Sequence, residues 1–257
     1  MSKIAVFDSG LGSLSIINAI RQRLKAEIVY LADQKNYPYG KKTKTDLRKI
    51  IKQTITNLQI QFDPDLIVVG SNTPSLLIAE IFDKNDAVIG VLPPLAEAQQ
   101  RTKTNSIGIL ATQSVVNSSE LDNYIRKNTI KNGIKFTKIN SSDLVDLVES
   151  GKFITKKNFC IKKITSTLKQ KFITNNIDVV TLSSTHLPFL ASYLQKLFPQ
   201  ITFLDPADKV VDQIANHRKF IPSEKNTLNI FTTGDANKLQ ANLYNMGIKK
   251  IVRQINF

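Results

Sequence analysis

The sequence predicts an α/β fold whose parallel sheets are of the doubly wound kind, with helices on both faces. Two observations support this prediction. Short runs rich in Ile and Val alternate with longer segments of helical periodicity, and the chain contains two halves of similar pattern. Continuous apolar runs are typical of strands buried on both faces, which is how strands lie in parallel sheets covered by helices.

The expected elements alternate along the whole chain. We expect strands at residues 3–7, 27–32, 66–69, 87–91, 106–110, 135–139, 179–182 and 202–204, with a last strand at 229–232. We expect helices at residues 13–23, 45–59, 74–82, 118–127, 143–150, 157–174, 187–198 and 236–246. This alternation favours crossover connections between parallel strands.

The two halves resemble each other most clearly after one strand of each. Residues 66–69 run into Gly70-Ser71-Asn72-Thr73, and residues 179–182 run into Ser183-Ser184-Thr185-His186. Open α/β sheets place their ligand sites at the carboxyl ends of the strands, so both tetrapeptides are candidates for a binding site. Ser, Thr and Asn are also good helix N-caps, and capping is the alternative explanation for either tetrapeptide taken alone.

The composition indicates a globular protein without disulfides or structural zinc. The chain has 257 residues, 42% of them hydrophobic, with one cysteine, Cys160, and two histidines. One cysteine cannot form an internal disulfide, and two histidines beside it give no metal-ligand spacing. No apolar run is long enough to span a bilayer, and the first residues enter a strand pattern without a signal segment. We therefore expect a cytoplasmic protein without membrane contact.

The formal charge of +14 raises the question of a nucleic-acid partner. Most of the excess is lysine dispersed through polar stretches, as at Lys156 and Lys157, and no Arg-rich tract or recognition motif accompanies it. We expect a solvated lysine surface and no nucleic-acid partner. Weak attraction for anionic ligands, including acidic metabolites, is the remaining interpretation.

Two glycine-containing loops follow the first two expected strands. Residues 8–13 lead into a helix, and their glycines leave backbone N–H groups free for an anionic ligand, while Asp8 at the strand tip could orient an ammonium group. The full G-x-G-x-x-G fingerprint is absent, so we expect no nucleotide cofactor. After the second strand, residues 37–40 are either ordinary loop punctuation or a loop whose Tyr39 closes one side of a small pocket.

The two histidines have different neighbours. Glu149 closes an amphipathic segment before Gly151, where a solvated helix-end charge is the ordinary interpretation. The alternative is an acid–imidazole pair with His186, which keeps the imidazole charged and ready to pass a proton. His217 has no such neighbours and is expected at the surface, and Cys160 is expected to be a buried, inert thiol.

Six short motifs, taken together and in order, resemble the aspartate/glutamate racemase family and are closest to its glutamate racemases. They are Phe7-Asp8-Ser9-Gly10, Tyr37-Pro38-Tyr39-Gly40, Ser71-Asn72-Thr73, Gly108-Ile109-Leu110-Ala111-Thr112, Val148-Glu149-Ser150-Gly151 and Ser184-Thr185-His186. The resemblance runs from residue 3 to about residue 210. It implies two pseudo-symmetric α/β lobes, at 1–95 with 208–257 and at 96–207, with the site in the cleft between them. It also implies an isomerase that uses no cofactor and forms a homodimer, and we expect no metal because the cysteine and histidine content gives no metal-ligand spacing.

The resemblance further implies which residues form the site. The family inverts an amino-acid α-carbon with two thiols, one removing a proton from one face and the other returning a proton to the opposite face. Ser71 and Ser184 stand where the family has these cysteines. A thiol titrates at about pH 8.5 and exchanges the two roles readily, whereas a serine hydroxyl is a far weaker acid. The other catalytic positions match at Asp8, Glu149 and His186, and those expected to bind substrate match at Ser9, Tyr39, Gly40, Asn72, Thr73 and Thr185.

Three flanking positions also depart from the family pattern. Ser13 and Ser183 stand where glycine is usual, and Leu187 stands where tyrosine is common. These changes favour natural divergence over an installed pair of substitutions.

The sequence therefore predicts a glutamate racemase-like protein that binds glutamate or a related small dicarboxylate, with racemisation lost or strongly impaired. One alternative is a glutamate racemase that carries Cys-to-Ser substitutions. Another is a descendant enzyme with different chemistry, in which Ser184 and His186 act as nucleophile and base, although no G-x-S-x-G elbow is present.

Overall fold

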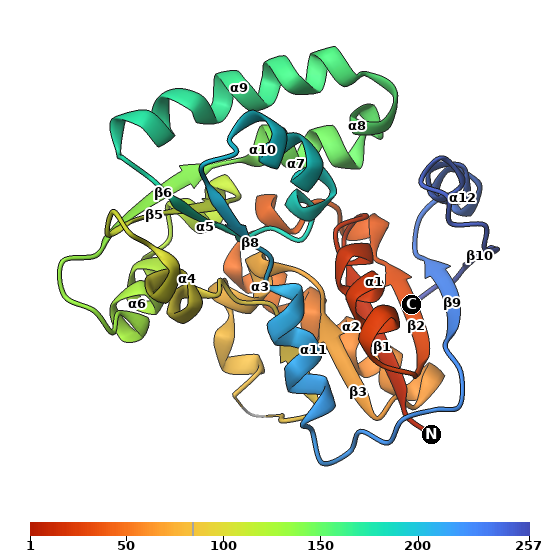
Figure 1. The fold of residues 1–257 in the computed structure, drawn as a ribbon. Helices are drawn as coiled ribbons and strands as arrows, with labels where there is room; N and C mark the ends of the chain where they lie inside the picture. The colour runs from red at the N-terminus through yellow and green to blue at the C-terminus, as the bar shows by residue number, and fades with distance from the viewer. Residues whose placement is uncertain (84) are drawn as a thin grey trace. The chain divides into compact units, whose positions relative to one another are not determined.

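A computed structural model describes residues 1–83 and 85–257 of the chain. The fold is α/β, as predicted, and contains two parallel sheets (Figure 1). The chain divides into two compact units, the first formed by Met1–Val91 with Ala207–Phe257 and the second by Leu92–Pro206. In the part of the chain that is described, no helix is both long and apolar enough to cross a membrane.

The first unit is built on a six-stranded sheet in the order β10-β9-β2-β1-β3-β4, and every neighbouring pair is parallel. Its strands are β1 (Lys3–Asp8), β2 (Glu27–Ala32), β3 (Leu66–Val69), β4 (Val88–Gly90), β9 (Thr227–Thr232) and β10 (Val252–Gln254). All four residues of β3 are buried, in agreement with its continuous apolar sequence. The C-terminal part of the chain thus adds β9 beside β2, which comes from the N-terminal part.

Five helices accompany this sheet in the described part of the first unit. They are α1 (Leu14–Arg23), α2 (Lys44–Phe62), α3 (Asn72–Leu77), α11 (Ala207–Ala215) and α12 (Ala236–Asn245), with the 3₁₀ turns η1 (Gln34–Asn36), η2 (Tyr39–Lys41) and η3 (Ala79–Ile81). Helices α1 and α11 pack side by side (Figure 1), and Arg23 of α1 forms ion pairs with Asp208 and Asp212 of α11. These pairs connect the two chain segments that make up the unit.

The long helix α2 has ends that the sequence explains. The Thr43 hydroxyl accepts a hydrogen bond from the Asp46 backbone N–H at 3.1 Å, which is N-capping. Asp63 follows the helix with φ of 44°, a left-handed conformation that stops it. The buried side chains of α2 join a core cluster with residues of β1 and β3, among them Leu47, Ile51, Leu58, Phe7 and Val69.

The second unit is built on a four-stranded parallel sheet in the order β6-β5-β7-β8. Its strands are β5 (Ser106–Ala111), β6 (Lys135–Asn140), β7 (Val179–Leu182) and β8 (Thr202–Leu204). Its helices are α4 (Leu95–Arg101), α5 (Gln113–Val116), α6 (Ser119–Asn128), α7 (Ser142–Glu149), α8 (Lys152–Thr155), α9 (Lys157–Thr174) and α10 (Ala191–Leu197), with the 3₁₀ turn η4 (Leu187–Leu190). A core cluster joins α7, α9 and α10 to the sheet.

The two sheets share one strand order. In the first unit the order β2-β1-β3-β4 has the same pattern as β6-β5-β7-β8 in the second, with the first strand of each half in an inner position and the third strand beside it. β3 and β7 therefore occupy equivalent places, and each is followed by one of the two candidate tetrapeptides. This shared order supports the internal repeat that the sequence indicates.

Two helices predicted as continuous are divided in the structure. The segment expected at 74–82 consists of α3 and the separate turn η3, because Ile78 leaves the helical conformation at φ −135° and ψ 45°. The segment expected at 187–198 begins with the 3₁₀ turn η4, in which Pro188 lies near the start, and becomes α-helical only at Ala191. The helices α4, α5, α8 and α11 and the strand β10 were not predicted.

Candidate functional site

The turn after β3 is held against the start of α1. A Cβ added to Gly70 would lie 2.3 Å from the Cβ of Ser13, so the backbone passes too close to Ser13 for any larger residue. Ser75 in α3 donates from its hydroxyl to the Ser71 carbonyl at 2.7 Å and accepts from the Val91 N–H at 2.9 Å. The position of Ser71 is thus fixed by its neighbours in the helix and in the sheet.

Ser71, Asn72 and Thr73 are all buried at this turn. The Asn72 side chain donates to the Val91 carbonyl at 3.0 Å, while its oxygen Oδ1 is buried without a hydrogen-bond partner among the described residues. The Ser71 hydroxyl also forms no hydrogen bond with another described residue, and Ser71 does not cap α3 with its side chain. The simple capping explanation is therefore wrong for Ser71, and both polar groups are available to a ligand.

The turn after β7 has the same character. Ser184, Thr185 and His186 are buried, and no hydrogen bond joins the Ser184 hydroxyl to another described residue. Ser183, one of the departures from the family pattern, is used internally, since its hydroxyl lies 2.9 Å from the Thr181 hydroxyl.

Glu149 and His186 form a pair in the second unit. The imidazole Nε2 lies 3.0 Å from the Glu149 carboxylate, and the two side chains are 7% and 17% exposed. The contact between Glu149 and His186 is confirmed, and the interpretation of Glu149 as a solvated helix-end charge is wrong. The role of the pair in proton transfer stays a prediction. The physical reason is that α7 ends beside η4, so its last residue faces the segment that carries His186.

In the first unit the structure brings Asp8, Ser9 and Tyr39 together. The Ser9 N–H donates to the Asp8 carboxylate at 2.6 Å, and the Tyr39 N–H donates to the Ser9 hydroxyl at 3.4 Å. Gly40 follows Tyr39 within the turn η2. The loop after β1 and the loop after β2 are therefore joined through Ser9, at the carboxyl edge of adjacent strands.

The Tyr39 side chain is anchored inside the unit. Its hydroxyl donates to the Asp33 carboxylate at 2.8 Å, and both residues are 2% exposed. Burial, followed by the nearby charges of Asp33 and Asp8, holds the pKa of Tyr39 well above its usual range, so the phenol stays neutral and donates. The hydroxyl is occupied by Asp33, and the ring packs in the hydrophobic core cluster that also contains Phe7 and Leu47.

Asp33 is a functional candidate that the motifs did not single out. Besides Tyr39, its carboxylate accepts hydrogen bonds from the Asn36 amide at 2.9 and 3.0 Å and from the Thr233 hydroxyl at 3.1 Å. The available signal was its position directly after β2, because Asp8 was selected for the same position after β1. Thr233 comes from beyond β9 and has no such signal.

The remaining chemical groups lie outside these clusters. Cys160 is buried in the core of the second unit, its thiol lies 3.4 Å from the Lys152 carbonyl, and burial raises its pKa, as expected for an inert thiol. His217 is partly exposed and bonds to the Asp86 carbonyl through Nε2 at 3.0 Å.

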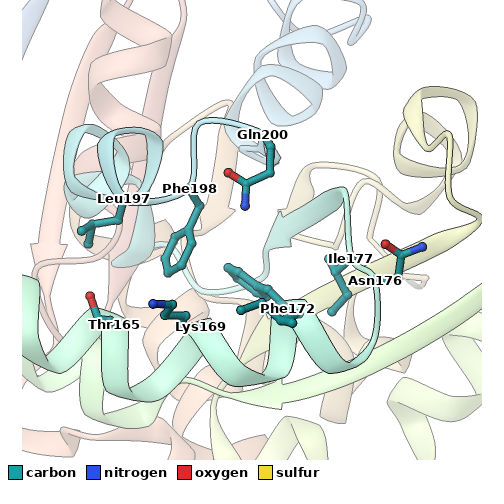
Figure 2. A pocket seen from close by; sticks show the side chains of 9 residues that line it. Thr165, Lys169, Phe172, Asn176, Ile177, Leu197, Phe198 and Gln200 are labelled. Carbon is teal, nitrogen blue, oxygen red and sulfur yellow. The ribbon is translucent and has the colours of Figure 1, made fainter.

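A cavity in the second unit is separate from the candidate residues. It has a volume of about 470 Å³ and lies against the C-terminal half of α9 (Figure 2). Phe172 and Phe198 line it, with ring centroids 5.0 Å apart, and so do Lys169 and Gln200 (Figure 2). None of the predicted site residues is among the described residues that line it, so this cavity is not the candidate site.

Comparisons with known proteins agree with the fold. No protein-family model matches the chain. The chain is 32% identical over 218 residues to the glutamate racemase of Chlorobaculum parvum, which covers 82% of this chain and 78% of that one. A glutamate racemase isoform from Bacillus anthracis has a TM-score of 0.87 at 23% identity, covering 100% of this chain and 98% of its own. Escherichia coli glutamate racemase in complex with L-glutamate has a TM-score of 0.83 at 23% identity, covering 99% and 98%.

The structural likeness defines a class of α/β protein with two parallel sheets. The sequence likeness identifies the family within that class. The chain belongs to the aspartate/glutamate racemase family, and the relatives that match it are glutamate racemases.

Proposed function

We propose that the protein binds glutamate or a related small dicarboxylate, and that cofactor-independent racemisation is lost or strongly impaired. The observation that carries the proposal is the state of the two serine hydroxyls. Ser71 and Ser184 follow strands in equivalent places of their sheets, both are buried, and neither hydroxyl is bonded to another described residue. Groups placed in this way at strand ends are suited to a ligand.

The side chains proposed to bind the ligand in each unit suit an acidic amino acid. The Asp8 carboxylate can hold an ammonium group, while the Asn72 amide, the Thr73 and Thr185 hydroxyls and backbone N–H groups of the loops can hold carboxylates. Binding of L-glutamate by the Escherichia coli relative supports this ligand class. The ring of Tyr39 and the backbone of Gly40 are proposed to close one side.

The proton-transfer step is where the chain departs from its relatives. Abstraction of an α-proton needs a base whose pKa lies near the working pH, and a serine hydroxyl supplies no appreciable alkoxide unless a base activates it. The pair of Glu149 with His186 is engaged at 3.0 Å and is proposed to act in substrate binding and positioning. Cys160 cannot replace the thiols, because it lies in the apolar core with a raised pKa.

Calorimetric titration with L- and D-glutamate and with aspartate tests the binding half of the proposal. We expect binding of at least one of these ligands, and no binding of any of them at millimolar concentration would refute the proposal.

We also propose, from the family, that the protein is a cytoplasmic homodimer that uses no cofactor.

Circular dichroism of L-glutamate incubated with protein tests the chemical half. We expect no loss of optical activity with the native chain and measurable loss with the double variant Ser71→Cys/Ser184→Cys. Each single variant serves as the matched control, since two-base inversion needs an acid on each face and one thiol should not suffice. Turnover by the native chain would show that the serines, or another base, support the reaction.

A further inference from the structure

A large groove runs along α2 in the first unit. Its volume is about 940 Å³, and it is lined by α2, by the turn that contains η1, and by residues that follow β9 and β10. Asp33, the residue that holds Tyr39, lies at its wall. The groove is therefore lined by a residue that is hydrogen-bonded to Tyr39, which belongs to the proposed site.

Three lysines give the groove a strong positive charge. Lys35 comes from η1, and Lys49 and Lys52 come from α2. All three are exposed, and none forms an ion pair with another residue that the structure describes. Because Lys49 and Lys52 are three residues apart on one helix, their charges are neighbours and repel each other. An anion bound between them would turn this repulsion into attraction.

Glu80 and Asp33, two acids near these lysines, already interact with other groups of the protein. Glu80 lies within electrostatic reach of Lys52, but its carboxylate is 2.7 Å from the Arg48 guanidinium. Asp33 is the acidic side chain among the described lining residues, and its oxygens are occupied by donors from Tyr39, Asn36 and Thr233. The lysines thus outnumber the acid that faces the groove.

The neutral lining favours a hydrophilic ligand. Thr54 lines the groove with only 5% exposure, and its hydroxyl forms no hydrogen bond with another described residue, so it can bond to a ligand. Gln53 and Asn57 also line the groove and are held in place by a 2.8 Å hydrogen bond between their side chains. Polar groups fixed in this way can orient an anion through hydrogen bonds.

A short chain of hydrogen bonds connects residues that line the groove to Tyr39. The Lys35 N–H donates to the Thr233 hydroxyl at 3.0 Å, and that hydroxyl donates to Asp33 at 3.1 Å. The Asn36 amide and the Tyr39 hydroxyl donate to the same carboxylate. A ligand that contacts Lys35 or Asn36 therefore acts on the group that anchors Tyr39.

We propose that this groove binds a small molecule with two or more phosphate or carboxylate groups, and that its binding is transmitted through Asp33 to the Tyr39 loop. Lys49 and Lys52 hold one anionic group, and Lys35 with Thr54 and Asn36 meets the rest of the ligand. Binding of an anion in this groove does not depend on which ligand binds near Ser71 and Ser184.

Calorimetric titration of the whole chain with pyrophosphate and, separately, with citrate tests the site at low ionic strength. We expect at least one of the two to bind, and binding of only one shows whether the site prefers phosphate or carboxylate groups. The double variant Lys49→Gln/Lys52→Gln should weaken this binding by about tenfold, because two adjacent charges are lost. The matched control Lys162→Gln/Lys171→Gln removes the same charge from exposed positions on α9 and should leave binding nearly unchanged. Absence of binding by both anions, or equal loss in both variants, would overturn the site.

Hydrogen exchange measured by mass spectrometry tests the transmission. Saturation with the anion that binds should alter exchange in the peptide covering residues 33–41. Tyr39→Phe removes the hydroxyl that donates to Asp33 and lies outside the lining of the groove, so it should reduce that alteration while the anion still binds. Unchanged exchange at residues 33–41 in the saturated native chain would overturn the link to Tyr39.

Discussion

Replacing Tyr39 with Phe removes one hydroxyl from a buried pair and leaves the ring in place. The lost interaction is a 2.8 Å hydrogen bond to the Asp33 carboxylate, with both residues 2% exposed. Hydrogen bonds to charged groups contribute about 1.5–3 kcal/mol to stability. Asp33 keeps its donors from Asn36 and Thr233, so it is not left bare. We expect Tyr39→Phe to lower the free energy of unfolding by about 1.5–2 kcal/mol, the lower part of that range.

A double-mutant cycle separates this bond from other effects of the substitutions. Asp33→Asn should lower the free energy of unfolding by more, about 2–4 kcal/mol. The amide replaces one of the two accepting oxygens with an NH2 group, which is a donor. In the combined variant the two losses should overlap, giving a coupling energy of about 1–2 kcal/mol. Urea unfolding followed by far-UV circular dichroism measures all four proteins.

Tyr244→Phe is the matched control, since Tyr244 is 58% exposed, and it should change stability by less than about 0.5 kcal/mol. A coupling energy below about 0.3 kcal/mol in the cycle, within ordinary additivity, would refute the inference that Asp33 anchors Tyr39.

Three further predictions concern packing, titration and capping. Gly70→Ala should destabilise the protein by about 1–3 kcal/mol because its Cβ would meet Ser13, and Ser13→Gly in the same chain should restore part of the loss in a urea titration. In the folded protein, absorbance at alkaline pH should show Tyr39 and Tyr124 ionising late, since burial raises the pKa of Tyr124 to about 12 and that of Tyr39 well above its usual range. The unfolded chain then releases these protons first, so stability should fall as pH rises above about 10, and a stability independent of pH there would contradict the burial of both phenols. Thr43→Ala should cost about 1 kcal/mol by removing the N-cap of α2, and thermal unfolding that shows no loss would contradict the cap.

The central strands of the two sheets could be predicted from the sequence because strands such as β3 and β7 are short apolar runs that are buried along their whole length. The strands at Glu27–Ala32, Leu66–Val69, Val179–Leu182 and Thr202–Leu204 have the predicted bounds. β10 was missed because Val252–Gln254 has two exposed polar residues out of three, so it gives no apolar run. Its place is set by pairing with β9, which is a tertiary contact.

The site could be predicted only in part. The strand-end positions of Ser71 and Ser184 follow from the apolar runs before them, which local sequence reveals. The pair of Glu149 with His186 joins residues 37 positions apart, and its formation depends on how α7 packs beside η4. The Asp33 carboxylate that anchors Tyr39 also accepts a hydrogen bond from Thr233, which is distant in the sequence and reaches Asp33 because β9 pairs with β2.

That pairing also orders events while the chain is being made. β2 leaves the ribosome early, but its partner β9 is synthesised only after all four strands of the second unit. Throughout that interval β2 presents an unpaired edge of N–H and C=O groups, the kind of edge that recruits strands from other chains. The first sheet of the nascent protein therefore remains incomplete until every strand of the second sheet has been made. If synthesis stopped before β9, the edge of β2 would stay open permanently.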